Sequence, residues 1–189
     1  MRRARTGKDP DAFAELVRRH EGRVRSLLLR LCGGDRALVD DLAQDVFLRA
    51  YRGLPGFAGR SAFGTWLYRI AYNIFLNHAT RTRAHDALEP GATEAAEPLW
   101  DPGEDTPDRS DLRRDLDRAI AKLPPAYRAA VVLYYLRGVS YADMAQILDL
   151  PLGTVKTHLH RARAALRATM CGWEPAPAEA TTAAREGRP

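Results

Sequence analysis

The chain has 189 residues, of which 46% are hydrophobic, and it carries a formal net charge of +5. This length fits one medium domain or two small domains joined by a linker, and a basic chain suits an anionic partner. The two cysteines, Cys32 and Cys171, lie far apart and belong to no Cys or His cluster, which argues against a zinc site. We therefore expect neither a bound metal nor a cofactor.

The sequence also argues against an enzyme and against a membrane protein. It contains no P-loop, metal motif or nucleophile–base set, so catalysis is not expected. No apolar stretch approaches the length that crosses a membrane, and none follows the basic residues 1–5 as it would in a signal peptide. These features predict a cytoplasmic protein without membrane insertion.

The N-terminal part of the chain has the pattern of amphipathic helices. Apolar side chains recur every three, four or seven residues over 11–32, which predicts a helix that the two glycines at 33–34 end. A second helix is expected over 37–52. Because helix-favouring residues dominate and β-branched runs are scarce, we expect an all-α fold.

A loop, a third helix and an acidic segment follow. Residues 53–60 are rich in Gly and Pro and predict a loop, after which Ser61 is the expected N-cap of a helix over 62–82. Residues 84–111 contain nine acidic residues and one arginine. Self-repulsion and the absence of an apolar period predict a flexible, disordered linker over 84–109.

Helical periodicity returns near Leu112 and predicts a second helical domain over 110–171. Its first helix ends at Pro124–Pro125, and a second helix is expected over about 125–137. A short helix starts with a capping-box-like pattern at Ser140–Asp143, and a final helix starts with Thr154 as its cap and ends near Met170. Residues 172–189 are rich in Pro, Ala, Glu and Thr and are expected to form a disordered tail.

The last two helices have a helix-turn-helix layout, with a tight turn at 149–153 between them. Nothing acidic occurs between Thr154 and Cys171, so the second of them presents a basic face that would fit the major groove of DNA. An ordinary solvated helix with a cationic face is the alternative. His158 and His160 are two residues apart and point away from each other on a helix, which argues against a metal site.

Three stretches of this domain, residues 123–128, 138–145 and 153–163, resemble region 4 of bacterial RNA polymerase sigma factors of the extracytoplasmic-function class. The resemblance implies that the final helix reads the −35 promoter element. It implies the following DNA-contacting residues: Thr154, Lys156, Thr157, His160, Arg161 and Arg163. Helix-turn-helix domains of response regulators share the Gly-Thr-Val-Lys-Thr-His pattern at 153–158.

Residues 40–52 resemble sigma region 2.2, which docks on the clamp helices of the polymerase β′ subunit. Asp41, Gln44 and Asp45 would then form the docking face beside an apolar stripe. The family usually has Glu where Asp45 stands. A solvated acidic face is the alternative.

Residues 57–79 resemble sigma regions 2.3 and 2.4, which capture and melt the −10 promoter element. Holding an unstacked base needs aromatic faces and amide edges, and holding its backbone needs cations. The candidate −10 contacts are Phe57, Arg60, Arg69, Tyr72, Asn73 and Asn77. Trp66 and Phe63 are expected to be packing residues. The loop reads Phe-Ala-Gly-Arg-Ser at 57–61, where the family usually has Phe-Arg-Gly-Asp/Glu-Ser.

Taken together, the motifs predict a sigma factor with a region 2 domain over 1–83 and a region 4 domain over 110–171. It is expected to bind core RNA polymerase through the β′ clamp helices and the β flap. Promoter DNA and an anti-sigma factor are its other expected partners. One alternative is a stand-alone regulator of the response-regulator type, which would need a receiver or ligand-binding domain. Another is an RNA-binding or architectural protein that binds duplexes without promoter preference.

Overall fold

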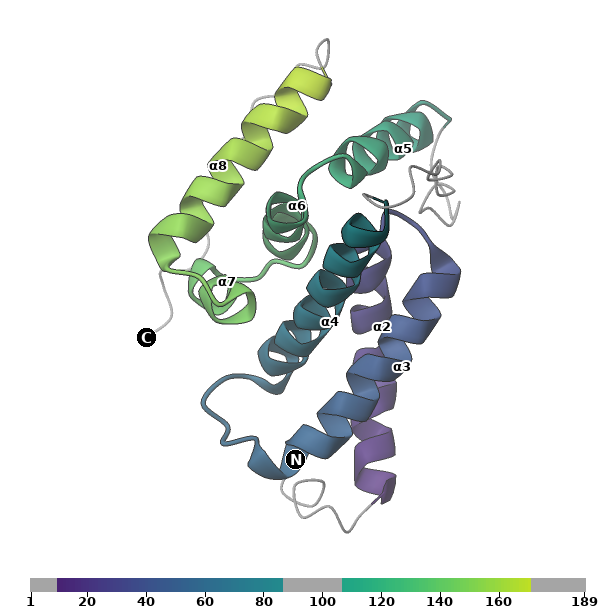
Figure 1. Ribbon diagram of the computed structural model, residues 1–189, viewed down its shortest axis with the longest axis vertical. Coiled ribbons are helices and arrows are strands. Elements are labelled where there is room, and N and C mark those ends of the chain that lie inside the picture. The colour runs from purple at the N-terminus through teal and green to yellow at the C-terminus, as the bar shows by residue number, and fades with distance from the viewer. Residues whose placement is uncertain (1–9, 87–106, 171–189) are drawn as a thin grey trace, which may run out of the picture.

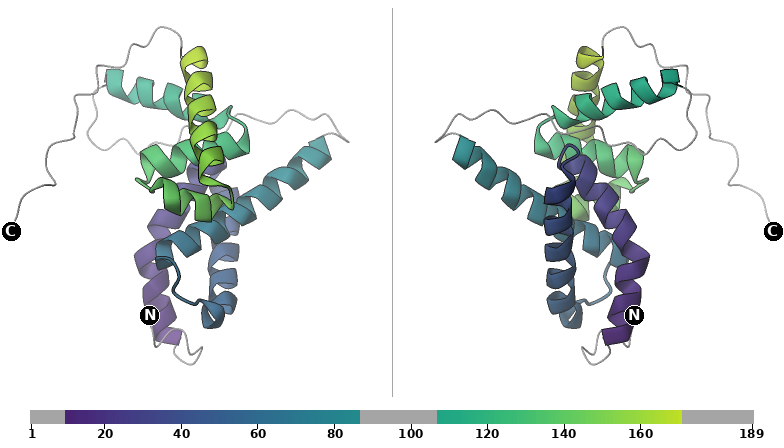
Figure 2. Two further views of the ribbon diagram at one scale, coloured as in Figure 1. Left: turned by 90° about the vertical axis from the view of Figure 1, so that its left-hand side faces the viewer. Right: turned by 90° about the vertical axis from the view of Figure 1, so that its right-hand side faces the viewer.

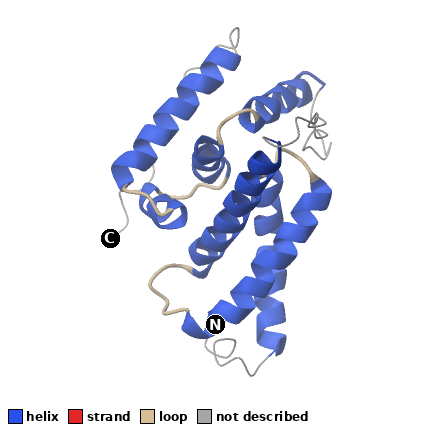
Figure 3. Ribbon diagram, viewed as in Figure 1, coloured by secondary structure: helices blue, strands red, loops and turns tan. Residues whose placement is uncertain are grey.

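The structure is a computed structural model that describes residues 10–86 and 107–170. Within these two ranges every regular element is helical and no strand occurs, which confirms the all-α prediction (Figures 1 and 3). The greater part of the predicted linker and the tail at 172–189 lie outside the described residues.

Three helices form the N-terminal domain: α2 (Pro10–Leu31), α3 (Arg36–Gly53) and α4 (Phe63–Asp86). Helices α2 and α3 turn back on each other at Gly33 and Gly34, whose φ angles of 69° and 106° suit glycine. Asp35 then caps α3 by accepting a hydrogen bond from the Leu38 backbone N–H at 2.9 Å. The three helices bury Leu27, Val46 and Leu67 between them, each 1% exposed or less.

The C-terminal domain holds four α-helices: α5 (Pro107–Ala121), α6 (Pro125–Val131), α7 (Tyr141–Leu148) and α8 (Leu152–Thr169). The helix expected over about 125–137 is divided, because α6 continues into a π-helical turn, η2 (Val132–Leu136). Gly138, with φ at 62°, follows that turn and redirects the chain toward α7.

Four predicted boundaries are wrong by a few residues. Helix α4 begins at Phe63, and Ala62 accepts its first backbone bond from Trp66 N–H at 3.1 Å, so Ser61 lies one position before the cap. The same helix extends to Asp86, into the expected linker. Helix α8 begins at Leu152 with Pro151 before it, so Thr154 lies inside its first turn. Helix α5 begins at Pro107, before the periodic apolar residues that marked it in the sequence.

The two helical domains pack against each other and share one apolar core. Buried residues of both domains, such as Leu67 and Met144, belong to a single cluster, and α4 lies against α7 while α2 lies against α5 and η2. Figure 2 shows the same arrangement from two sides, with the C-terminal part of α4 projecting beyond the bundle. This packing places the first helix of the helix-turn-helix beside the N-terminal part of α4.

Candidate nucleic-acid interface

One side of helix α8 is buried against other helices, and the opposite side is exposed to solvent. Val155, Leu159 and Ala162 are 3% exposed or less and fix α8 on α6 and α7. On the other side, five of the six residues expected to contact the −35 element are exposed: Lys156, Thr157, His160, Arg161 and Arg163. Thr154 is half-buried in the first turn. The structure therefore brings these side chains together on one outward, cationic face.

The turn before α8 is fixed by local hydrogen bonds. Ser140 caps α7 by accepting from the Asp143 backbone N–H at 3.1 Å, and its hydroxyl donates to the Asp143 carboxylate at 2.7 Å, as the capping pattern predicts. Asp149 ends α7 in the left-handed region with φ at 55°, and Leu150 N–H returns to the Ala145 carbonyl at 3.1 Å. Only three residues then separate α7 from α8, which gives a tight helix-turn-helix.

Tyr127 on α6 supports two side chains of α8. Its hydroxyl accepts a hydrogen bond from Arg161 Nη1 at 3.4 Å, and its ring meets the His158 ring edge-on at 5.2 Å between centroids. His158 is half-buried, and burial, with Arg161 nearby, lowers its pKa. His158 thus belongs to the packing of α8 on α6, while His160 is exposed.

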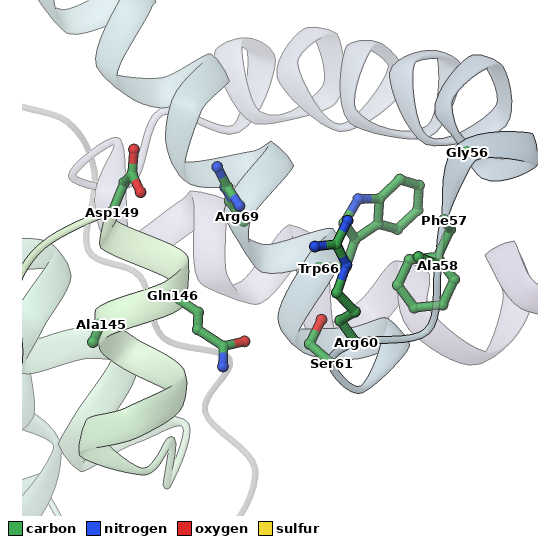
Figure 4. A pocket seen from close by; sticks show the side chains of 10 residues that line it. All are labelled: Gly56, Phe57, Ala58, Arg60, Ser61, Trp66, Arg69, Ala145, Gln146 and Asp149. Carbon is green, nitrogen blue, oxygen red and sulfur yellow. The ribbon is translucent and has the colours of Figure 1, made fainter.

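A second candidate surface surrounds a cavity of about 620 Å³ beside the 56–61 loop (Figure 4). Phe57, Arg60 and Arg69, three of the residues expected to contact the −10 element, line it. The full lining is Gly56, Phe57, Ala58, Arg60, Ser61, Trp66, Arg69, Ala145, Gln146 and Asp149. The cavity therefore combines aromatic rings with two guanidinium groups from the N-terminal domain.

Trp66 has a larger part in this cavity than the sequence suggested. It packs against Phe57 at 5.0 Å and against Phe63 at 5.5 Å between ring centroids, as expected of a packing residue, yet it also lines the cavity. The signal for this role is its spacing. Trp66 lies three residues before Arg69 and seven before Asn73, so all three share one face of α4. Phe63, at 7% exposed, is a core residue as predicted.

The remaining −10 candidates divide between the surface and the core. Asn73 and Asn77 are exposed and continue the face of Arg69 along α4. Tyr72 is 4% exposed and packs in the apolar core, and its burial raises its pKa. A base contact by Tyr72 therefore stays a prediction, and it would require the ring to leave the helices that enclose it here.

The acidic face of α3 is exposed to solvent. Val39, Leu42 and Val46 bury one side of the helix, and Asp41, Gln44 and Asp45 are exposed on the other. Leu48 follows on the same face and is 46% exposed. Asp40 is engaged by Arg25, whereas among the described residues no basic side chain forms an ion pair with Asp41 or Asp45.

The described residues contain no cluster of three or more His, Cys, Asp or Glu side chains that could hold a metal ion. None of the helices in residues 10–86 and 107–170 is long and apolar enough to span a membrane.

Comparison with known proteins gives consistent matches over both domains. The family model for Sigma-70 region 2 matches residues 16–85, and the model for Sigma-70, region 4 matches residues 113–166. A relative named ECF RNA polymerase sigma-E factor, from Haemophilus influenzae, is 39% identical over 164 residues, which cover 82% of this chain and 85% of the relative. The ECF RNA polymerase sigma factor SigW of Bacillus subtilis is 35% identical, with 84% and 89% of the two chains covered.

Solved structures share the fold. The sigma factor RpoE of Bartonella quintana, solved with the anti-sigma factor NepR, superimposes with a TM-score of 0.70 over 84% of this chain and 96% of that chain, at 23% identity. CnrH, solved with the cytosolic domain of CnrY, gives a TM-score of 0.62 over 89% and 92% of the two chains, at 27% identity.

Proposed function

The chain belongs to the ECF sigma factors of RNA polymerase, and we propose that it directs core polymerase to promoters through two separate DNA-reading surfaces. The observation that carries this proposal is the pairing of an outward cationic face on α8 with aromatic and cationic side chains of the N-terminal domain, which line a cavity beside the 56–61 loop. Core polymerase supplies catalysis, and this chain supplies recognition.

Helix α8 reads the −35 element in the major groove. Lys156, Thr157 and His160 lie toward its N-terminal end, the part of a recognition helix that reaches base edges. The Thr157 hydroxyl donates to the Gly153 carbonyl at 3.0 Å, which leaves its oxygen to accept from a base amino group. Arg161 and Arg163 contact phosphates and set the register, with Tyr127 positioning Arg161.

The second surface captures the −10 element during strand opening. Unstacking a base costs a few kcal/mol, which a protein pocket must offset. Phe57 and Trp66 offer ring faces to an unstacked base, and Arg60 and Arg69 attract the strand backbone. Asn73 and Asn77 extend this surface along α4 with amide edges for further bases.

The acidic face of α3 docks on the polymerase. Asp41, Gln44 and Asp45 are exposed and suit a partner helix that carries Arg and Lys, such as the β′ clamp helices. The C-terminal domain makes a second contact, with the β flap. An anti-sigma factor holds the protein inactive in the cytoplasm, by analogy with the Bartonella quintana relative solved with NepR.

Co-elution with bacterial core RNA polymerase tests this function. The parent chain should bind stoichiometrically, and the variant with Gln44→Ala and Asp45→Ala should not. Asp115→Ala removes an exposed acid from α5 and should bind as the parent does. Retained binding by the double variant would remove α3 as the docking face. No polymerase binding by the parent, together with tight sequence-specific duplex binding, would favour a stand-alone regulator.

A further inference from the structure

The first turn of α8 lies earlier in the chain than the sequence indicated, and it brings Leu152 into the recognition helix. Helix α8 begins at Leu152. The Pro151 carbonyl accepts the first two backbone bonds, from Thr154 N–H at 2.9 Å and from Val155 N–H at 3.1 Å. Leu152 and Gly153 therefore occupy the first two positions of the helix that is proposed to enter the major groove.

Leu152 is a large apolar side chain that its own domain leaves uncovered. It is 43% exposed, whereas Val155 and Leu159 on the buried side of α8 are 3% exposed or less. Single exposed leucines are common on protein surfaces, so the position of this one decides its meaning. Leu152 lies four residues before Lys156, and this spacing places both side chains on one face of the helix. An apolar group therefore stands at the N-terminal tip of the cationic face.

Neither the backbone nor the packing of α8 requires a glycine at position 153. Gly153 does not have a positive φ angle, and a Cβ atom built on it would meet none of the described neighbours within 4 Å. Glycine is also less favourable than alanine inside a helix. The missing side chain leaves room for a partner that approaches α8 from outside the chain.

We propose that the first turn of α8 seats against a thymine of the −35 element. Leu152 contacts the C5-methyl group of that thymine, and Gly153 gives the clearance that lets the turn approach the base pair. The proposal rests on the sigma function argued above. It adds a side chain that specifies one base to a face that otherwise carries cationic and hydrogen-bonding groups.

Thymine is the base that an apolar side chain selects. In the major groove the edges of adenine, guanine and cytosine present hydrogen-bond donors and acceptors, whereas thymine adds a methyl group. Leucine has no polar group to pair with the edge of another base, and covering such an edge leaves it without water. Contact with the methyl group instead removes apolar surface of both partners from water, which is worth about fourfold in affinity.

The spacing along α8 also predicts where this thymine lies. Leu152 and Lys156 are four residues apart, which is about 6 Å along a helix axis. Successive bases of one strand are about 3.4 Å apart. The thymine should therefore lie roughly two base pairs from the base that Lys156 contacts.

Replacement of thymine by uracil tests the contact, because uracil pairs in the same way and lacks only the methyl group. The −35 sequence is first selected from randomised duplexes by holoenzyme assembled from the full chain and core polymerase. Each thymine of the selected element is then replaced by deoxyuridine, and fluorescence anisotropy gives the affinity. At one position the parent should lose about fourfold in affinity, and Leu152→Ala should bind the thymine and uracil forms equally.

Two further variants separate the methyl contact from general effects. Tyr135→Ala removes the other large apolar side chain that is exposed in residues 107–170, and it should keep the parent's ratio of thymine to uracil affinity. Gly153→Ala should weaken binding of every selected duplex by about tenfold, because the added methyl group enters the space of the DNA. The urea unfolding midpoint of the free Gly153→Ala chain should not fall.

The methyl contact is overturned if Leu152→Ala keeps the parent's loss at every thymine. A parent that is insensitive to every uracil, or a selected element without thymine, also overturns it. The clearance at Gly153 is overturned if Gly153→Ala binds as the parent does, or if its loss of affinity comes with a lower unfolding midpoint. Selection of no −35 sequence at all would show that the sigma function is wrong, and the contact would fall with it.

Discussion

Tyr72 and Asn73 are neighbours on α4 with opposite environments, and they provide a direct test of the −10 surface. Tyr72 is enclosed in the core, whereas Asn73 is exposed on the face that continues from Arg69. Asn73→Ala should weaken binding of a single-stranded −10 oligonucleotide by about tenfold, since it removes one amide edge. Tyr72→Phe should leave that binding unchanged, because the lost hydroxyl is not at the surface.

Fluorescence anisotropy with the polymerase holoenzyme measures both affinities. If Tyr72→Phe weakened oligonucleotide binding while its unfolding midpoint matched that of the parent, Tyr72 would have to move out of the core on binding DNA. That outcome would support the prediction that Tyr72 contacts a base.

His158 makes the stability of the C-terminal domain depend on pH. Its Nδ1 atom is buried and has no hydrogen-bond partner among the described residues, and burial lowers its pKa below 6.5 in the folded state. The neutral form therefore contributes stability that is present above pH 6.5 and lost as the pH falls through the lowered folded pKa. Protonation would also place a charge beside Arg161.

His158→Phe keeps a ring against Tyr127 and removes this titration. Urea unfolding at pH 7.5 and pH 5.5 should show a smaller loss of unfolding free energy for the variant than for the parent. His20, whose pKa is also lowered by burial, is present in both proteins and cancels in the comparison. Equal losses in the two proteins would assign the pH dependence to other groups.

At the scale of the element, α8 separates base contacts from phosphate contacts along its length. Lys156→Ala should reduce discrimination between −35 sequences by about tenfold, because a base contact is lost. Arg163→Ala should weaken binding to all sequences alike and reduce the slope of log affinity against log salt by about 1. Titrations of −35 duplexes at several salt concentrations measure both quantities.

Arg118→Ala, which removes an exposed arginine of α5, should leave the discrimination and the salt slope unchanged. If Arg163→Ala changed the sequence preference instead of the salt slope, the two roles along α8 would have to be exchanged.

The presence of each helix could be predicted from the sequence, because each helix has its own stripe of apolar residues. The spacing of apolar residues predicted the bounds of α2, α3 and α7 to within about two residues. The Ser140 cap followed from its local sequence pattern. The first residue of some helices was harder to predict. Pro151 and Leu152 at the start of α8 read as a turn, and the π-helical turn after α6 leaves no mark in the apolar period.

The burial of Tyr72, which the sequence did not predict, has a tertiary cause. Helix α4 packs against α2 and α3 on one side and α7 on another, so its buried arc is wider than a single stripe. Tyr72 lies beside Ala71 and three residues before Phe75, both buried, and this wider arc includes it. A family resemblance assigns roles to positions in the sequence. The burial of each side chain in the fold then decides whether that side chain can contact a ligand.

At the scale of the whole molecule, the sequence predicted two helical domains joined by a flexible acidic linker, and it did not predict that these domains pack against each other. The residues of this contact are scattered through α2, α4, α5 and α7, and none has a sequence pattern of its own. Arg30 and Asp117, for instance, are 87 positions apart. Long-range pairs of this kind follow from the packing of finished helices and not from local periodicity.

The Arg30–Asp117 pair offers a way to test how firmly the two domains hold together in the free chain. Arg30→Ala leaves the Asp117 carboxylate in the interface without its partner at 2.9 Å. A buried charge that loses its partner costs about 1–3 kcal/mol, and opening relieves this cost by hydrating Asp117. The radius of gyration of the free chain, measured by small-angle X-ray scattering at neutral pH, should therefore increase.

The double variant Arg30→Ala/Asp117→Asn should return the chain toward the closed dimensions, because the neutral amide no longer needs a counter-charge. Acid should have the same effect on Arg30→Ala alone: burial already raises the pKa of Asp117 above 3.8, and protonation as the pH falls removes the charge that favours opening. An Arg30→Ala chain that stays compact at neutral pH, or a double variant as open as the single one, would show that the apolar core alone holds the domains together.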